Sequence, residues 1–310
     1  MSTPEDAPPR FSGIRTFARR RHTTDPAGAD VAVVGIPFDT GTSYRPGARF
    51  GPEAIRSVSV LLRDYDPVID RDVLGSLNVI DIGDVWAPPG DAEGAVARLA
   101  DGLRPVVEAG ARTLGLGGDH LVALAELRAL AAVHGPLGLL LLDSHADTWD
   151  SYGGQRYFHG TPFRRAVEEG LVDPSRSLLA GMRGSLYSKQ DLDDATELGF
   201  ELIPWRELRT MSPGQYGDRA RARAGDGPAF LSFDVDFVDP AFAPATGTPE
   251  PGGPSSAEAL ELVRALDGIA FAGFDVVEVS PPYDSPGQPT ALLAANVAYA
   301  MLGLAALSRR

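Results

Sequence analysis

The sequence predicts a single α/β domain in which helices cover both faces of an eight-stranded parallel sheet. Short apolar runs, typical of buried strands, alternate with longer amphipathic segments, typical of helices, and short loops join them. This alternation favours βαβ units and therefore a parallel sheet. No Ser- or Gly-rich linker, charge block or internal repeat divides the chain, although its 310 residues are long enough for two domains.

The elements follow one another after a polar, proline-containing N-terminal arm. We assign residues 1–29 to this arm and residues 30–310 to one domain. The eight expected strands cover residues 30–38, 77–82, 112–116, 137–142, 177–180, 200–203, 229–233 and 269–276. The expected helices cover a segment that starts near Pro52, where proline suits a first turn, and residues 92–109, 121–133, 162–169, 189–198, 215–224, 256–266 and 290–308.

The strand expected over residues 137–142 leads directly into Asp143, His145 and Asp147. If the extended conformation continues, these three side chains share a face because they lie two residues apart. Two carboxylates and an imidazole at the carboxyl end of a buried strand are typical of a metal site. The alternative is a polar loop whose acids cap the next helix.

Other polar clusters also follow expected strands. His120 ends the motif GGDH after strand 112–116, Asp234 and Asp236 follow strand 229–233, and Glu278 follows strand 269–276. In parallel α/β sheets, the carboxyl ends of the strands form the edge at which ligands bind. We therefore expect these side chains to converge on one site, which favours the metal interpretation over the capping loop.

The expected metal ligands are four carboxylates and two imidazoles. Six ligands exceed the three that a catalytic zinc usually takes, and they suit two ions that share carboxylates. An oxygen-rich set without thiolates favours Mn²⁺. Two such ions lower the pKa of a shared water towards neutrality and so provide a hydroxide nucleophile. The predicted ligands of two Mn²⁺ ions are His120, Asp143, His145, Asp147, Asp234 and Asp236.

Two further residues are candidates for catalysis at this edge of the sheet. His159 follows the loop 149–157, and its imidazole titrates near neutral pH, which suits a proton shuttle; a loop histidine with satisfied hydrogen bonds is the alternative. Glu278 ends an apolar strand and suits a buried ion pair or the binding of a cation. A guanidinium group pairs well with a carboxylate, so a guanidinium held by Glu278 beside a hydroxide is set up for hydrolytic C–N cleavage.

Composition excludes several classes of protein. The net charge of −14 disfavours nucleic acid and anionic membranes as partners and favours a cationic substrate. The chain has no cysteine, which excludes disulfides and thiolate metal sites. The longest apolar stretches are near ten residues, too short to span a bilayer, and no apolar segment follows Arg19–Arg21 as an export signal requires. We expect a cytoplasmic protein.

On these motifs the chain resembles the ureohydrolase superfamily, which includes arginase, agmatinase and guanidinobutyrase. The resemblance spans GIPFDTGTSYRPGARFGPEAIR (35–56), GGDH (117–120), DSHAD (143–147), SFDVDFVDPAFAPATGTPEPGG (232–253) and EVSPPYD (278–284). It implies a three-layer αβα fold with an eight-stranded parallel sheet, a pair of Mn²⁺ ions, and release of urea from a guanidino compound. It also implies a homotrimer or homohexamer, with residues 30–310 as the catalytic domain.

The resemblance implies a role for each candidate residue. Asp143 and Asp234 would bridge the two metal ions, and the other four ligands would complete the pair. His159 would protonate the leaving amine, and Glu278 would bind the substrate guanidinium. The agmatinase and guanidino-acid branch is the more similar, because the segments 159–170 and 181–188 resemble it.

The substrate is less strongly indicated than the reaction. Arginases carry an asparagine where this chain has Trp149, and an indole does not replace the hydrogen bonds of an amide. We therefore expect agmatine, which is cleaved to putrescine and urea. The alternative is a guanidino acid, as in guanidinobutyrase or guanidinopropionase, with a cation near the mouth from Arg183, Arg156, Arg164 or Arg165. The expected residues of the tail pocket are Trp149, Tyr152 and Arg183.

Two other classes of function are considered. Zinc-dependent lysine and acetylpolyamine deacetylases share this general fold, but they have tandem histidines beside one zinc ion, and this chain has no such pair. A non-enzymatic sensor would be expected to lack a ligand or the shuttle histidine, whereas here every position is filled. Both alternatives are therefore disfavoured.

Overall fold

The computed structural model describes residues 9–309 and contains one nine-stranded, fully parallel sheet. The strand order is β1-β5-β2-β6-β11-β10-β7-β8-β9. The strands are β1 (Arg21–His22), β2 (Val31–Gly35), β5 (Val79–Asp84), β6 (Arg112–Leu116), β7 (Gly138–Leu142), β8 (Leu178–Ala180), β9 (Glu201–Ile203), β10 (Ala229–Asp234) and β11 (Phe271–Val277). A separate hairpin pairs β3 (Tyr65–Asp66) with β4 (Arg71–Asp72).

The predicted α/β fold is confirmed, and all eight expected strands are present. The predicted count of eight is wrong by one, because β1 adds an edge strand beside β5. The helices also follow the expected order. They are α1 (Gly51–Ser59), α2 (Val73–Ser76), α3 (Ala92–Glu108), α4 (Val122–His134), α5 (Pro162–Glu168), α6 (Gln190–Glu197), α7 (Trp205–Leu208), α8 (Pro213–Ala224), α9 (Ser256–Arg264) and α10 (Pro289–Leu307).

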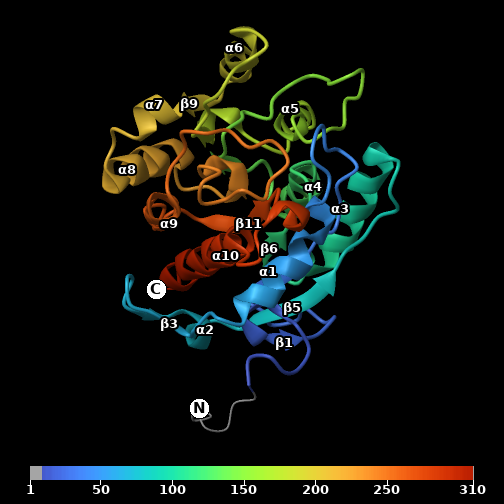
Figure 1. Cartoon of the computed structure of the whole chain (residues 1–310), viewed down its shortest axis with the longest axis vertical. Helices are drawn as coiled ribbons and strands as arrows, with labels where there is room; N and C mark the ends of the chain where they lie inside the picture. Colours follow the sequence, from blue (N-terminus) through green and yellow to red (C-terminus); the bar gives the residue numbers. More distant parts are fainter. Residues whose placement is uncertain (1–8, 310) are drawn as a thin grey trace.

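Helices cover both faces of the sheet, which gives three layers. Helices α1 and α10 lie side by side on one face, next to α9 (Figure 1). Helix α4 contacts both α3 and α5, and the three cover the other face. Side chains of β7 alternate between the layers, with Leu140 and Leu142 in one apolar core and Leu139 and Leu141 in the other. Both faces of this strand are therefore buried, which explains its unbroken apolar sequence.

Part of the N-terminal arm packs on the domain. Phe17 is fully buried, and its backbone N–H donates to Asp81 Oδ2 at 2.8 Å. The same carboxylate accepts from Arg56 Nε at 2.9 Å, so Asp81 joins the arm to α1. Strand β1 then pairs with β5 at Ile80 and Asp81. Residues 1–8 of the arm lie outside the described part.

Helix α10 is more apolar than the sequence analysis allowed. Its 19 residues are long and apolar enough to cross a membrane by length and composition alone, and its most apolar window is 83% buried inside the fold. The helix packs against β11, α1 and α9. Burial within the domain therefore accounts for its apolar sequence.

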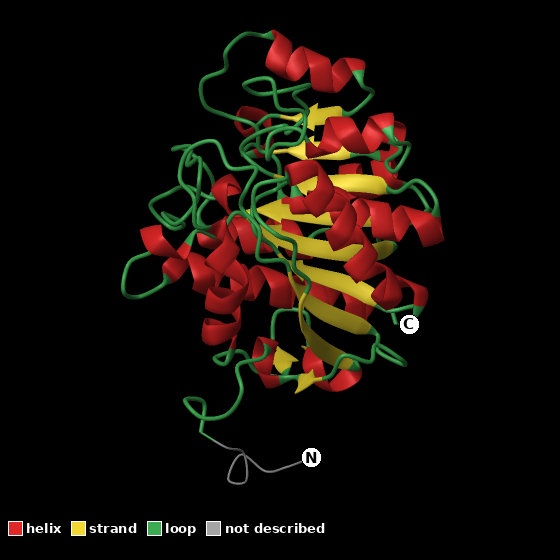
Figure 2. Cartoon of the chain, turned by 90° about the vertical axis from the view of Figure 1, so that its right-hand side faces the viewer, coloured by secondary structure: helices red, strands yellow, loops and turns green. Residues whose placement is uncertain are grey.

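Four adjacent strands, β6, β11, β10 and β7, form the centre of the sheet. In Figure 2 the arrowheads of the central strands point towards a group of loops. The polar clusters predicted from the sequence follow these four strands. The topology therefore places His120, Glu278, Asp234 and Asp143 along one edge of the sheet.

Candidate metal centre and catalytic pocket

The loop after β6 positions His120 in the interior. At Gly118 the chain passes so close to β2 that an added Cβ would lie 1.7 Å from the carbonyl oxygen of Phe38, so only glycine fits. The N–H of Asp119 donates to that same carbonyl at 2.8 Å. His120, which follows, has no exposed surface. The glycines of the GGDH motif therefore serve to bring the imidazole under the sheet edge.

The imidazole of His120 faces three carboxylates. Its Nδ1 lies 2.9 Å from Oδ2 of Asp147, and 3.2 Å from Oδ2 of both Asp143 and Asp234. The four residues come from three different strand ends, which are far apart in the sequence. The predicted convergence is therefore observed for this half of the set.

The hydrogen bond at the other nitrogen of His120 determines which ring nitrogen carries the proton. Its Nε2 lies 2.8 Å from Oγ of Ser232, and that hydroxyl donates to Oδ1 of Asp275 at 2.6 Å. Because the hydroxyl proton goes to Asp275, Ser232 accepts a proton from Nε2 of His120. The lone pair of a neutral ring then lies on Nδ1 and points at the carboxylates, as metal ligation requires.

A second group forms around His145. Its Nδ1 lies 3.1 Å from Oδ2 of Asp236 and 3.5 Å from Oδ1 of Asp143. Asp143 thus presents one oxygen to each histidine and connects the two groups. The predicted second bridge, Asp234, has its Oδ2 near His120, while its Oδ1 accepts the N–H of Asp236 at 2.8 Å.

The backbone reason for this convergence differs from the one expected. Strand β7 ends at Leu142, so the alternation of an extended strand does not continue through the DSHAD motif. Asp147 instead has a φ of +51°, and Glu278 has a φ of +66°. Left-handed conformations of this kind are uncommon outside glycine and are concentrated at functional sites.

Charge repulsion within the group is shown by its pKa values. Burial and the neighbouring Asp143 raise the pKa of Asp147 to about 6. Burial, Asp236 and Asp143 raise the pKa of Asp234 well above its usual value. Burial by itself lowers the pKa of His120 and of His145, but the facing carboxylates raise both. The group therefore stabilises positive charge at its centre.

The residues fit a metal pair. Nδ1 of His120 and Oδ2 of Asp143 are buried and make no hydrogen bond within the described residues, although oxygen and nitrogen atoms surround them. Two clusters have ligand atoms close enough to hold one ion each: His120 with Asp143 and Asp147, and Asp143 with His145 and Asp236. Imidazole nitrogens and carboxylate oxygens suit Mn²⁺.

His159 and Glu278 lie beside this centre and contact each other. The Nδ1 of His159 is 2.9 Å from Oε1 of Glu278. Its Nε2 is 2.8 Å from Oγ of Ser43 and 3.3 Å from the backbone nitrogen of Ser43. That backbone N–H can only donate, so Nε2 accepts and the ring proton lies on Nδ1, directed at Glu278. Burial lowers the pKa of His159, but Glu278 raises it above the usual value overall.

Glu278 uses one of its two oxygens within the protein. Its Oε1 accepts from His159 and, at 2.9 Å, from the backbone N–H of His120. Its Oε2 is buried and has no hydrogen-bond partner among the described residues. An added Cβ at Gly247 would lie 3.2 Å from this oxygen. The oxygen is therefore a buried acceptor without a donor, and an N–H group of a ligand would satisfy it.

A cavity of about 470 Å³ opens onto the site. The loops that follow β7, β8, β9 and β10 form it, and His145, Asp147, His159 and Asp234 lie on its wall. Trp149 also lines the cavity, as predicted. Tyr152 is not among the residues that line it; its ring stacks on the indole of Trp149 with centroids 5.8 Å apart.

The arginines proposed from the sequence have other partners. Arg183 lines the cavity, but its guanidinium donates to the carbonyl oxygens of Asp236, Phe237 and Glu250. It therefore fixes the loop after β10. The other three pair with carboxylates: Arg156 with Glu168, Arg164 with Asp194, and Arg165 with Asp150 and Glu168.

Sequence reasoning missed five polar residues of the site. Ser43, Ser232 and Asp275 hold the catalytic and ligand side chains through the contacts described above. Ser232 and Asp275 lie within or beside quoted motifs, so their position was a usable signal. Arg206 and Arg209 line the cavity; Arg206 lies in the four-residue helix α7 and Arg209 directly follows it, and so short a helix has no periodic pattern.

The comparisons with known proteins agree with this geometry. A family model described as the arginase family matches residues 29–303. The chain is 46% identical to a guanidinopropionase from Pseudomonas aeruginosa, covering 97% of this chain and 94% of that protein. It is 43% identical to a mitochondrial agmatinase from Gallus gallus, covering 94% and 85%.

Among solved structures, the proclavaminate amidino hydrolase of Streptomyces clavuligerus superimposes with a TM-score of 0.92. It is 41% identical and covers 97% of this chain and 100% of that one. The remoter zinc deacetylase alternative receives no support from these matches. The chain belongs to the arginase family and is a hydrolase of the branch that contains agmatinases and guanidino-acid hydrolases.

Proposed function

We propose that this protein is a two-Mn²⁺ hydrolase that cleaves a guanidino compound to urea and an amine. One observation carries the proposal: two histidine–carboxylate groups share Asp143, and the unpartnered Oε2 of Glu278 lies beside them. His120, Asp147 and Asp234 would hold one ion with Asp143. His145, Asp236 and again Asp143 would hold the other.

The residues of the chain have separate tasks in the reaction. When bound, the metal pair supplies a water-derived nucleophile at neutral pH. Glu278 binds the guanidinium through its free oxygen and so orients the central carbon. Water adds its oxygen to that carbon, and the C–N bond to the substrate tail breaks. His159 gives a proton to the departing nitrogen, which leaves as an amine.

The surroundings of His159 support this role. Its side chain lines the cavity, and Glu278 fixes its ring at 2.9 Å. The carboxylate also favours the protonated form of the ring, which is the form that a proton donor requires. Ser43 contacts Nε2 at 2.8 Å, and its hydroxyl is positioned to relay a proton between the ring and the cavity.

The two candidate substrates differ in the group at the far end of the tail. Agmatine, the substrate expected from the sequence, carries an amine at its far end, and one relative is named an agmatinase. A guanidino acid carries a carboxylate, and another relative is named a guanidinopropionase. The free arginines of the outer cavity favour the guanidino acid. Assembly into a trimer or hexamer and a cytoplasmic location remain parts of the proposal.

The test is urea release by the purified protein loaded with Mn²⁺, together with its metal content. We expect about two Mn²⁺ per chain and urea from at least one of agmatine, 3-guanidinopropionate and 4-guanidinobutyrate. A folded, metal-loaded protein that releases no urea from any guanidino compound would contradict the proposal. Acetyl-lysine turnover with one zinc per chain would replace it with the deacetylase alternative.

A further inference from the structure

Helix α7 and the residue that ends it place two exposed arginines on the wall of the catalytic cavity. Arg206 and Arg209 are three residues apart, so they lie on the same side of a helical turn. Both line the cavity, together with Trp205 and Pro204. Trp205 is buried, its N–H donates to the carbonyl of Met182 at 3.0 Å, and its ring packs edge-on against Phe237. The turn that carries the arginines is therefore held firmly against the site.

Neither guanidinium has an ion pair or hydrogen bond within residues 9–309. This distinguishes the pair from the other arginine of the cavity, Arg183, which is occupied by backbone carbonyls. Glu258 contributes an electrostatic interaction with Arg209. Its carboxylate, however, accepts from the N–H and hydroxyl of Ser255 and so caps α9. Arg206 and Arg209 thus keep their hydrogen-bond donors for a ligand.

The acidic residues on the cavity wall do not pair with the two arginines. Asp147 and Asp234 belong to the metal centre. Asp191 is the remaining acidic residue on the described wall, and its Oδ2 accepts the N–H of Tyr187 at 2.9 Å. The outer cavity therefore favours an anion, although the whole chain carries a net charge of −14. This local excess of positive charge opposes the amine of agmatine.

Apolar side chains line the same cavity as the candidate metal ligands and the arginines. Met182, Leu186 and Leu192 lie on this wall with the indole of Trp149. Such a lining suits a methylene chain, and a cavity of about 470 Å³ falls within the range of small-molecule sites, about 300–1,000 Å³. The cavity thus combines a guanidinium site, an apolar middle and a cationic outer end.

We propose that Arg206 and Arg209 form a carboxylate subsite that selects ω-guanidino acids over agmatine. The inference rests on the proposed guanidino hydrolysis and adds the substrate class and the residues that determine it. Guanidinium groups bind carboxylates through paired hydrogen bonds, which fix orientation as well as charge. The two arginines would hold the tail carboxylate while Glu278 holds the guanidinium.

The experiment measures hydrolysis of three compounds by the Mn²⁺-loaded enzyme: 5-guanidinopentanoate, butylguanidine and agmatine. All three carry a four-carbon chain on the guanidino group and differ in what ends it, which is a carboxylate, a hydrogen atom and an amine. Shorter acids, 3-guanidinopropionate and 4-guanidinobutyrate, measure the preferred length. We expect the highest kcat/KM for an acid and the lowest for agmatine. In Arg206→Gln and Arg209→Gln, the KM of the best acid should rise relative to that of butylguanidine by about two- to fivefold each, because the ion pairs are partly solvated.

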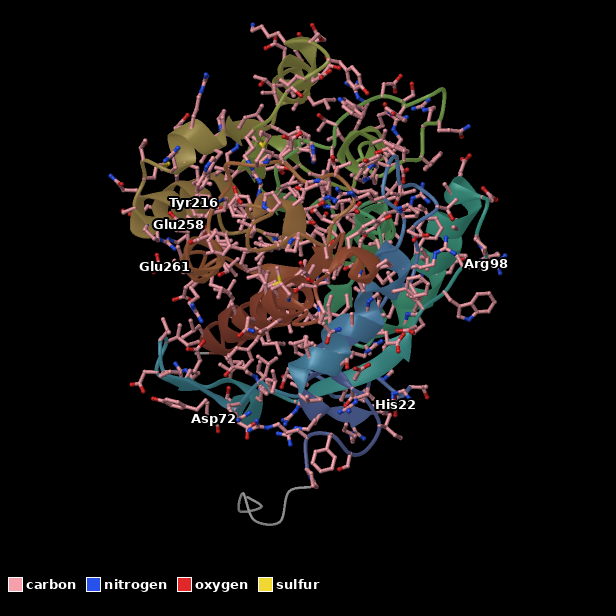
Figure 3. The ribbon with its side chains drawn as sticks, viewed as in Figure 1. His22, Asp72, Arg98, Tyr216, Glu258 and Glu261 are labelled. Atoms are coloured by element: carbon pink, nitrogen blue, oxygen red, sulfur yellow. The ribbon has the colours of Figure 1, made fainter. Side chains whose placement is uncertain are left out.

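Charge reversal and a distant control make the test specific. Arg206→Glu should shift the ratio of kcat/KM towards agmatine, which a merely structural role would not do. Arg98→Gln is the matched control, because Arg98 is an exposed arginine on α3, on the opposite side of the molecule from α7 (Figures 1 and 3). It should leave the ratio of acid to butylguanidine unchanged.

Failure of this inference is distinguishable from failure of the proposed function. Preference for agmatine, or equal changes for all three substrates in the arginine variants, would overturn the subsite while urea release persists. If no urea forms, calorimetry still decides the subsite: 5-guanidinopentanoate should bind the wild-type protein more tightly than Arg206→Gln/Arg209→Gln. Equal affinities of both proteins for that acid would overturn the inference.

Discussion

The Nδ1 atom of His159 lies 2.9 Å from Oε1 of Glu278, and both side chains are buried at the edge of the candidate metal centre. The carboxylate that would bind the guanidinium therefore also orients the imidazole that would protonate the leaving amine. Substrate binding and proton donation share one residue. Substitution of Glu278 should therefore affect both substrate binding and proton donation, whereas substitution of His159 should affect proton donation.

His159→Ala should retain both metal ions and lose turnover. The side chain contacts Glu278 and Ser43 but is not one of the predicted ligands. We expect kcat to fall by about 10²–10³, the range of a lost general acid. Metal analysis of the same preparation is the control, and a loss of Mn²⁺ would show that the role of His159 is misassigned.

Glu278→Gln should weaken use of the guanidinium. The amide keeps the size of the side chain but removes the negative charge beside the free Oε2 position. We expect kcat/KM to fall by about 10- to 100-fold, as for a lost hydrogen bond to a charged group. Glu261→Gln, on the exposed side of α9 (Figure 3), is the control. An unchanged kcat/KM in Glu278→Gln would remove Glu278 from substrate binding.

Asp143→Ala and Asp147→Ala should differ in metal content. Asp143 has one oxygen near His120 and the other near His145, whereas the carboxylate of Asp147 lies beside His120. Asp143→Ala should therefore lose both ions and Asp147→Ala one of them. Metal analysis after dialysis measures this, and two tightly held ions in Asp143→Ala would contradict the shared site.

The strands and the convergence of the candidate ligands were predictable because their signals are local. The apolar run 137–142 is buried on both faces, and the ligands directly follow strand ends. Strand β1 was missed because a two-residue, charged segment has no strand pattern; its pairing depends on Phe17 and Asp81, which are far apart in the sequence. The sequence could not show, for a similar reason, which arginines have donors left for a substrate. Whether Arg183 or Arg206 is free depends on tertiary partners that the sequence does not reveal.

Glu126→Gln should stabilise the fold, increasingly so at higher pH. Glu126 is fully buried on α4, and neither oxygen has a hydrogen-bond partner in the described chain. Burial and the neighbouring Asp275 raise its pKa well above the usual value. The folded state therefore keeps a proton that the unfolded state releases above about pH 4.3, so stability falls as pH rises. Glutamine has no such proton, so its advantage should grow from pH 5 to pH 8. Guanidinium chloride unfolding of both Mn²⁺-loaded proteins measures the difference, and a gap that does not grow with pH would show that Glu126 is ionised in the fold.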